Sequence, residues 1–186
     1  MSLAIIAFAA LYYFIRKNEF AIFLTIIITL FIIFDLINYF SKNKNKLSRL
    51  FFKLYPKKKE EIKQPLTDAT IFLILTLILT ILLPKEIVIF ALILYTIVDG
   101  TEQIFGIALD EKTKIPWNKY KTIQGTFAGF VSAIIASYII IKFITPTVPL
   151  SIILPVSFIS ALAGTSKKYD NEIILSSIAL ILWLMI

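Results

Sequence analysis

Long apolar runs alternate with short polar connections along the whole 186-residue chain. Seven apolar segments can be marked, at residues 2–15, 20–40, 69–83, 87–98, 123–145, 148–163 and 173–186. A membrane-spanning helix needs roughly 20 residues, so the shorter segments either span with the help of flanking residues or are re-entrant. The pattern predicts an all-α fold, a polytopic integral membrane bundle of about seven transmembrane helices that forms a single domain over residues 1–186.

Composition supports this class and narrows the possible chemistry. The chain is 59% hydrophobic, and its mean hydropathy of +0.88 is higher than soluble domains usually reach. It contains no Cys and no His, which excludes thiolate nucleophiles, Ser-His catalysis and the usual zinc sites. Catalysis would have to rest on carboxylates, Lys, Asn and hydroxyl groups, and the metal expected with such ligands is a hard cation such as Mg²⁺.

The basic residues predict an orientation in the membrane. The second, fourth and sixth connections carry nine, four and two basic residues, fifteen of the 19 in the chain. With seven spans these connections share one side, and the excess of positive charge places that side in the cytoplasm. The basic connection 41–68 contains "LSRLFFKLYPKKK", which resembles an interfacial amphipathic helix in contact with anionic lipid.

Two acids stand on one predicted helix face at this cytoplasmic boundary. Segment 87–98 should continue as helix past Asp99, because no proline follows until Pro116. Asp99, Glu102 and Gln103 then share one face. The two carboxylates could hold Mg²⁺, or one could take a proton from a hydroxyl group. The alternative is a solvated helix end with no chemical role.

The stretch "KIPWNKYKTIQGT" precedes the next helix, which should begin near Thr122. Lys121 provides positive charge, Asn118 and Thr126 provide neutral hydrogen-bonding groups, and free N–H groups at a helix start favour phosphate. The alternative is that Thr122 is only an N-cap. Small residues recur every fourth position here, which is typical of close packing between membrane helices; they are Gly125, Gly129, Ala133 and Ser137.

Two further polar positions have both a functional and a structural interpretation. Asp170 and Asn171 precede the last helix on the predicted cytoplasmic side, where either could serve as an N-cap. Asp35 lies inside an apolar segment and should face the bundle interior. It could contact a substrate hydroxyl, but a buried hydrogen bond between helices is the favoured interpretation.

Taken in order, these stretches resemble a known signature. "DGTEQIFG" and "KIPWNKYKTIQGTFAG" are similar to the nucleotide-binding segments of the CTP-dependent lipid kinases, a family that includes dolichol kinase, phytol kinase and the CTP-using diacylglycerol kinase. The matching positions are Asp99, Gly106, Lys114 to Asn118, Lys121-Thr122, Gly125-Thr126 and Asp170-Asn171. The resemblance covers about half of the chain, from segment 87–98 to the end. One departure is that the acid often seen before the Asp-Asn pair is missing, with Gly164 nearby instead.

The resemblance implies a function and roles for individual residues. The function is transfer of the CTP γ-phosphate to a prenyl or polyprenyl alcohol such as phytol, geranylgeraniol or a dolichol, at the cytoplasmic membrane face. Asp99 would be catalytic, and Asp99, Glu102 and Asp170 would bind Mg²⁺. The nucleotide would be bound by Asn118, Lys121, Thr122, Gly125, Thr126 and Asn171.

Other functions remain open at the level of sequence. The substrate could instead be diacylglycerol. A CDP-lipid enzyme is a further alternative, because "DG" at Asp99 resembles the start of the CDP-alcohol phosphotransferase signature, although its Ala-Arg and closing paired acids are absent. A non-catalytic lipid-binding or scaffold protein would show no Mg²⁺-dependent CTP binding. The expected partners are CTP, the lipid alcohol and membrane lipids, and no nucleic acid.

Overall fold

The computed structural model describes residues 2–40, 66–108, 113–146, 148–166 and 170–185. In these ranges the chain forms seven α-helices, one short 3-10 helix and a two-stranded β-hairpin. The elements are α1 (Ser2–Phe14), α2 (Lys17–Phe40), α4 (Asp68–Leu82), α5 (Lys85–Ala108), β1 (Lys114–Ile115), β2 (Asn118–Thr122), α6 (Ile123–Phe143), η3 (Leu150–Ile152), α7 (Ile153–Ala163) and α8 (Asp170–Met185).

Each predicted apolar segment forms a helix, so the helical fold class is confirmed except for the hairpin. Helix α5 continues past Asp99 to Ala108, as the absence of proline predicted. Three helices, α2, α5 and α6, are long and apolar enough to cross a membrane, while α1, α4, α7 and α8 are shorter. The basic segment with the predicted interfacial helix lies largely within 41–65, outside the described residues.

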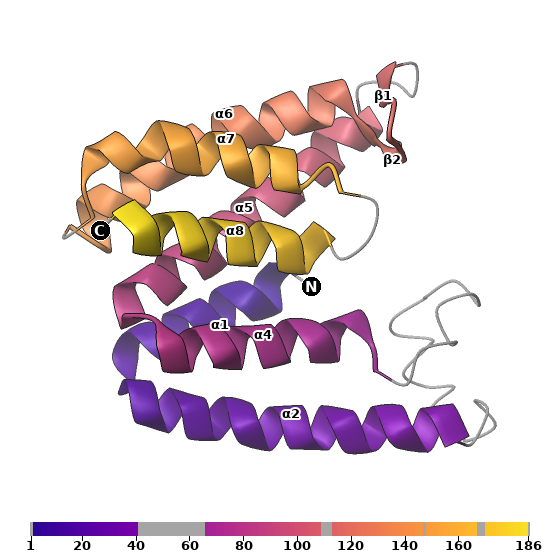
Figure 1. Ribbon diagram of the computed structural model, residues 1–186, viewed down its shortest axis with the longest axis vertical. Helices are drawn as coiled ribbons and strands as arrows, with labels where there is room; N and C mark the ends of the chain where they lie inside the picture. Colours follow the sequence, from indigo (N-terminus) through magenta and orange to yellow (C-terminus); the bar gives the residue numbers. More distant parts are fainter. Residues whose placement is uncertain (1, 41–65, 109–112, 147, 167–169, 186) are drawn as a thin grey trace.

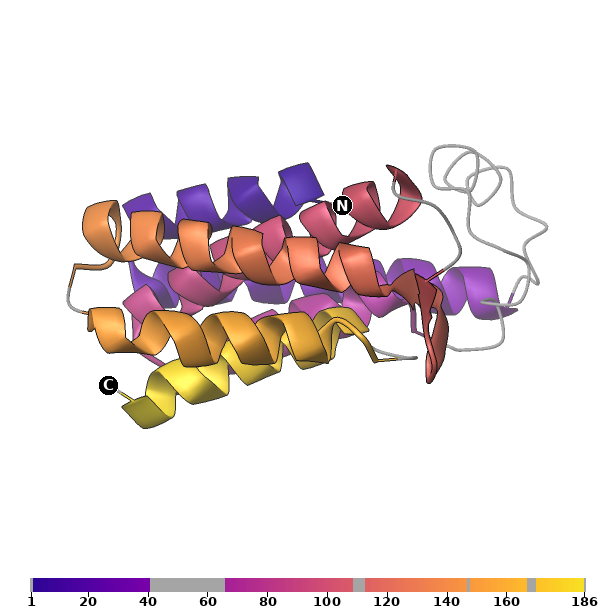
Figure 2. The same ribbon diagram turned by 90° about the horizontal axis from the view of Figure 1, so that it is seen from above.

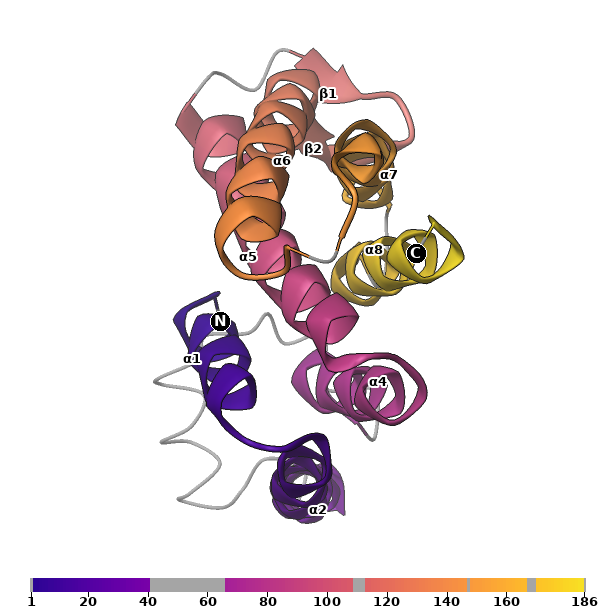
Figure 3. The same cartoon turned by 90° about the vertical axis from the view of Figure 1, so that its left-hand side faces the viewer.

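Helix α5 is the centre of the bundle. It crosses obliquely between a group made of α1, α2 and α4 and a group made of α6, α7 and α8 (Figures 1 and 3). Its side chains Val88, Phe90, Ala91 and Leu94 have no exposed surface. This central position explains why an almost continuously apolar helix also carries Asp99 and Glu102 into the interior of the bundle.

The helices alternate in direction, which gives the bundle two distinct ends (Figures 1 and 2). One end, here called the hairpin end, holds β1, β2 and the first residues of α4, α6 and α8. The opposite end, here called the turn end, holds the α1–α2, α4–α5 and α6–α7 connections. The segments that carry the predicted catalytic and nucleotide-binding residues therefore lie together at the hairpin end.

The outer surface of the bundle is strongly apolar. On α2, for example, Ile22, Ile26, Leu30 and Ile33 are each at least half exposed, and their spacing places them on one helix face. Contiguous apolar patches of this kind are rare on soluble monomers. The surface is therefore compatible with a protein embedded in lipid.

Two lysines connect the helix pairs at the turn end. Lys17, which begins α2, donates to two carbonyl groups at the end of α4, and Lys85, which begins α5, donates to two at the end of α1. The acceptor oxygens belong to Ile81 (3.0 Å) and Leu83 (3.0 Å), and to Tyr13 (2.9 Å) and Ile15 (2.7 Å). Each ammonium thus satisfies carbonyls that a helix terminus leaves without an intrahelical partner.

Asp35 joins α2 to the start of α4. Its Oδ2 accepts hydrogen bonds from the Thr67 amide (2.8 Å), the Thr67 hydroxyl (3.1 Å) and the Thr70 hydroxyl (2.6 Å). The carboxylate is buried, and it lies at a helix N-terminus, where negative charge is favoured. The interpretation of Asp35 as a buried hydrogen-bonding link between helices is therefore confirmed.

Candidate functional site

The last turns of α5 place two carboxylates inside the hairpin end. Asp99 is 8% exposed and Glu102 is 2% exposed, so the pair that the sequence placed on one helix face is directed into the bundle and not toward solvent. The Gln103 side-chain amide donates to both carboxylate oxygens of Asp99 at 2.8 Å. This contact holds the Asp99 carboxylate in one orientation.

The β-hairpin brings a lysine to these acids. Strands β1 and β2 are antiparallel, with Lys114 opposite Thr122 and Ile115 opposite Asn118. The chain reverses at Pro116 and Trp117, where proline is favoured in a turn. Because the chain turns back here, β2 runs toward the start of α6 along the C-terminal half of α5.

Lys121 lies between the two carboxylates. Its Nζ is 3.1 Å from Glu102 Oε2 and 4.0 Å from Asp99 Oδ1. The side chains are only 14%, 1% and 11% exposed for Lys121, Glu102 and Asp99. At such burial the charges are poorly screened, and removing one partner of a buried ion pair typically costs about 3–5 kcal/mol.

Glycines give Glu102 its place between α5, α6 and α7. A Cβ at Gly129 would lie 2.6 Å from Glu102 Cγ, and one at Gly164 would lie 2.5 Å from both carboxylate oxygens. A Cβ at Gly125 would lie 2.7 Å from the Glu102 backbone oxygen. Any side chain at these positions would displace Glu102. Together with the buried Ala133 and Ser137, these positions confirm the predicted close-packing stripe on α6.

Asn118 ties the hairpin to the end of α7. Its side-chain amide donates to the carbonyls of Thr165 (3.1 Å) and Ser166 (2.7 Å), and its Oδ1 accepts from the Tyr120 amide (3.0 Å). Trp117 adds a bond from its indole N–H to the Thr165 hydroxyl (3.2 Å). The role that these contacts indicate for Asn118 is therefore structural, because they fix the position of the strand that carries Lys121.

The start of α6 has the predicted N-cap. The Thr122 hydroxyl accepts a hydrogen bond from the Gly125 amide at 3.1 Å, which is the structural role considered from the sequence. The Thr126 hydroxyl oxygen is buried and has no hydrogen-bond partner among the described residues. Asp170 and Asn171 begin α8 at the same end of the bundle, and the side chain of Asp170 lies outside the described part of the structure.

Asp99 and Glu102 offer oxygen ligands of the type that Mg²⁺ prefers. Their carboxylates already converge on one cationic group, the Lys121 ammonium. Over residues 2–40, 66–108, 113–146, 148–166 and 170–185, no three acidic side chains come close enough to form a metal site. The third predicted ligand, Asp170, is the acid whose side chain is not described.

Comparison of the chain with protein-family models, with curated proteins and with solved structures gives no match. Function is therefore inferred from the geometry of the hairpin end and from the sequence signature.

Sequence reasoning did not predict the hairpin or the role of Gly164. The signal for the hairpin was short, since only Ile115 and Asn118 flank the Pro116-Trp117 turn. Gly164 follows the C-terminus of α7 at φ −62° and ψ −16°, a conformation open to any residue. The three atoms that a Cβ here would meet most closely all belong to Glu102, which is distant in sequence.

Proposed function

We propose that this protein is a CTP-dependent kinase that phosphorylates a prenyl or polyprenyl alcohol at the cytoplasmic membrane face. The observation that carries the proposal is the position of Lys121 against Asp99 and Glu102. These residues come from the two stretches, 99–106 and 114–126, that carry the resemblance to CTP-dependent lipid kinases. Their convergence at one end of an apolar bundle suits a charged donor and a lipid acceptor.

The proposed reaction is a single displacement. The alcohol oxygen attacks the γ-phosphorus of CTP, the bond from that phosphorus to the β–γ bridging oxygen breaks, and CDP leaves. The proton of the alcohol passes to Asp99. Such a reaction asks little covalent chemistry of the protein, which must align the hydroxyl and neutralise the phosphates.

Asp99, Glu102 and Asp170 would hold Mg²⁺, which supplies charge neutralisation on the phosphate oxygens when bound. In this assignment Lys121 is the second source of positive charge, and it would turn from the carboxylates toward phosphate. The first turn of α6, with Thr122, Gly125 and the buried Thr126 hydroxyl, is the neighbouring anion-binding element. Asn118 and Asn171 would position the nucleotide.

The position of the Glu102 carboxylate also favours this proposal. The signature often has an acid before the Asp-Asn pair, and this chain lacks that acid, with Gly164 nearby. Glu102 brings a carboxylate from α5 to this segment, since its two oxygens lie 2.5 Å from the position that a Cβ on Gly164 would take. An acid supplied by a different helix would thus retain negative charge near the segment that leads to the Asp-Asn pair.

The membrane arrangement belongs to the same proposal. All seven described helices would cross the bilayer, with the hairpin end in the cytoplasm and the turn end outside. The shorter helices α1, α4, α7 and α8 would cross with the help of flanking residues and local thinning of the bilayer. The multi-pass protein would then meet CTP and the lipid hydroxyl at the same membrane boundary.

The test is transfer of radiolabelled γ-phosphate from CTP to a panel of lipid alcohols by the purified protein in detergent. We expect wild-type protein to label a prenol, Asp99→Asn to lose turnover, and Asp68→Asn to retain it. Asp68 is a suitable control because it begins α4 at the same end and undergoes the same loss of charge. Labelling of diacylglycerol and not of prenols would identify diacylglycerol as the substrate. Absence of Mg²⁺-dependent CTP binding would favour a non-catalytic scaffold.

A further inference from the structure

In the described ranges, the exposed Trp and Tyr side chains lie toward the two ends of the bundle. Those at the hairpin end are Tyr39, Trp117 and Tyr120, and those at the turn end are Tyr13, Tyr138 and Trp183. Membrane proteins are enriched in Trp and Tyr at both membrane–water interfaces, because each side chain joins an apolar ring to a polar group. The distribution therefore marks two interfacial levels on the bundle.

The length of α2 agrees with a bilayer between these two levels. From Lys17 to Tyr39 the helix rises roughly 33 Å at 1.5 Å per residue, close to the roughly 30 Å of the hydrocarbon core of a bilayer. Asp35 is the only charged residue within 20–39, and it is buried. Tyr39 thus lies near the boundary of the hydrocarbon at the hairpin end.

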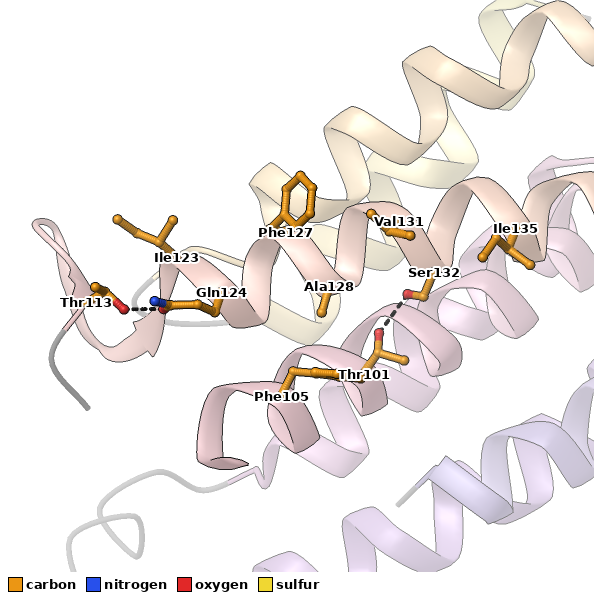
Figure 4. Close-up of a pocket in the computed structure, with 10 residues that line it drawn as sticks. All are labelled: Thr101, Phe105, Thr113, Ile123, Gln124, Phe127, Ala128, Val131, Ser132 and Ile135. Atoms are coloured by element: carbon orange, nitrogen blue, oxygen red, sulfur yellow. Dashed lines mark hydrogen bonds between the residues drawn. The ribbon is translucent and has the colours of Figure 1, made fainter. Parts of the chain in front are cut away.

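The exposed apolar surface continues as far as the hairpin. Ile107, in the last turn of α5, is 86% exposed. Ile123 and Phe127 are also exposed, and they project outward from the first turns of α6 (Figure 4). Ile123 directly follows Thr122, the last residue of β2. The hairpin therefore lies at the level where the apolar outer surface ends.

Hydrogen bonds hold the hairpin at this level. Thr113, just before β1, donates to the Gln124 side chain in the first turn of α6 (Figure 4). On the other side, the Trp117 indole donates to the Thr165 hydroxyl beyond the end of α7 (3.2 Å). Trp117 is nevertheless 55% exposed and Tyr120 is 76% exposed. The hairpin thus presents both aromatic side chains on the surface of the bundle at a fixed depth.

The hairpin is also basic. Residues 112–121 contain four lysines and no acid, and one of these lysines, Lys121, lies against Asp99 and Glu102. Basic segments beside a membrane are attracted to its anionic lipids. Exposed aromatic rings among lysines therefore match the boundary between acyl chains and anionic headgroups in both polarity and charge.

We propose that the β-hairpin is an interfacial anchor, in which Trp117 and Tyr120 lie at the boundary between the acyl chains and the headgroups of a bilayer. The anchor would hold β2, and with it Lys121, at the level of the membrane surface. That the bilayer crosses the bundle between its two ends rests on the membrane arrangement proposed above. The depth of the hairpin can be measured without CTP and without a lipid alcohol.

The experiment measures Trp fluorescence of the full-length protein in vesicles of phosphatidylcholine and phosphatidylglycerol. The lipids are brominated either near the headgroup or near the end of the acyl chain, and bromine quenches a nearby indole. The chain has two Trp residues, so Trp183→Phe leaves Trp117 as the sole reporter. We expect Trp117 to be quenched at least twofold more by bromine near the headgroup. If Trp183→Phe does not fold, the difference between wild type and Trp117→Phe gives the same signal.

Two reporters in a chain that carries Trp117→Phe and Trp183→Phe complete the design. Tyr120→Trp should reproduce the shallow profile of Trp117. Leu30→Trp, on the exposed face in the middle of α2, is the matched control and should be quenched most by bromine near the chain end.

Two results at Trp117 would overturn the anchor: quenching by aqueous iodide but by neither brominated lipid, or stronger quenching by bromine near the chain end. An unquenched Leu30→Trp would overturn the membrane arrangement and the anchor together. Shallow quenching of Trp117 without CTP-dependent transfer would refute the kinase and leave the anchor. Transfer to a prenol by a protein whose Trp117 is reached only by iodide would do the reverse.

Discussion

Gly164→Ala tests whether Glu102 occupies the place that defines the site. A Cβ at this position would lie 2.5 Å from both carboxylate oxygens, about 0.9 Å closer than ordinary contact, and the Glu102 carboxylate would have to move. If that movement lengthens the 3.1 Å distance to Lys121 Nζ to about 4 Å, the attraction falls by about 1 kcal/mol at an effective dielectric constant of 20. Overpacking adds about 1–3 kcal/mol.

The backbone opposes this loss only weakly. Gly164 has helical dihedral angles, so alanine fits the backbone and stabilises by about 0.4–1 kcal/mol through the unfolded chain. We therefore expect a net loss of about 1–4 kcal/mol. Gly100→Ala is the matched control, because nothing lies within 4 Å of a Cβ at Gly100, and it should be neutral or slightly stabilising.

Thermal unfolding in detergent would compare the two variants, followed by CTP-dependent initial rates. Glu102→Asp, which shortens the side chain by one methylene, should cost less in the Gly164→Ala background than in wild type, a coupling that a double-mutant cycle detects. Equal, stabilising effects of Gly164→Ala and Gly100→Ala would show that Glu102 does not lie against Gly164, and the reasoning about the site would fail.

Three further substitutions address the remaining polar contacts. Lys121→Ala should lower CTP-dependent turnover by at least tenfold and destabilise the protein by about 3–5 kcal/mol, because it removes a cation that lies against two buried carboxylates. Lys142→Ala, at the exposed end of α6, should do neither, and equal effects would contradict the assignment. Asp35→Asn should lower the unfolding midpoint, with a loss of about 1–3 kcal/mol from weakened hydrogen bonds, and leave the KM for CTP unchanged. Lys85→Met should cost about 0.5–1.5 kcal/mol in a chemical unfolding titration, because two carbonyl groups at the end of α1, one exposed and one partly buried, lose their donor. An unchanged midpoint would argue against the lysine caps.

The helices could be predicted from the sequence because their signal is local. Each apolar segment has the length and continuity of a helix, and the absence of proline after Asp99 was enough to extend α5 to Ala108. The faces of α5 and α6 also followed from periodicity, which placed Asp99 with Glu102 and Gly125 with Gly129. The inward orientation of the Asp35 side chain could also be predicted, because an unsatisfied carboxylate on the lipid-facing side of an apolar segment would be costly.

The contacts of the site could not be predicted in the same way, because they join residues that are distant in the chain. Lys121 reaches Glu102 only because a hairpin reverses the chain at Pro116. The need for glycine at position 164 arises from a side chain on α5, and no local pattern records it. The sequence therefore predicts Asp99 and Glu102 as a pair of acids on one face. It predicts Lys121 as a phosphate ligand, but not its contact with these two carboxylates.

The lysine contacts at the turn end have a consequence for biosynthesis. The α1–α2 pair and the α4–α5 pair each depend on the other. Lys17 of α2 donates to carbonyl groups at the end of α4, and Lys85 of α5 donates to carbonyl groups at the end of α1. During translation these contacts can therefore form only after the second pair has left the ribosome. A defect at Lys17 would therefore appear as premature degradation of a chain in which α4 fails to dock, although Lys17 itself belongs to α2.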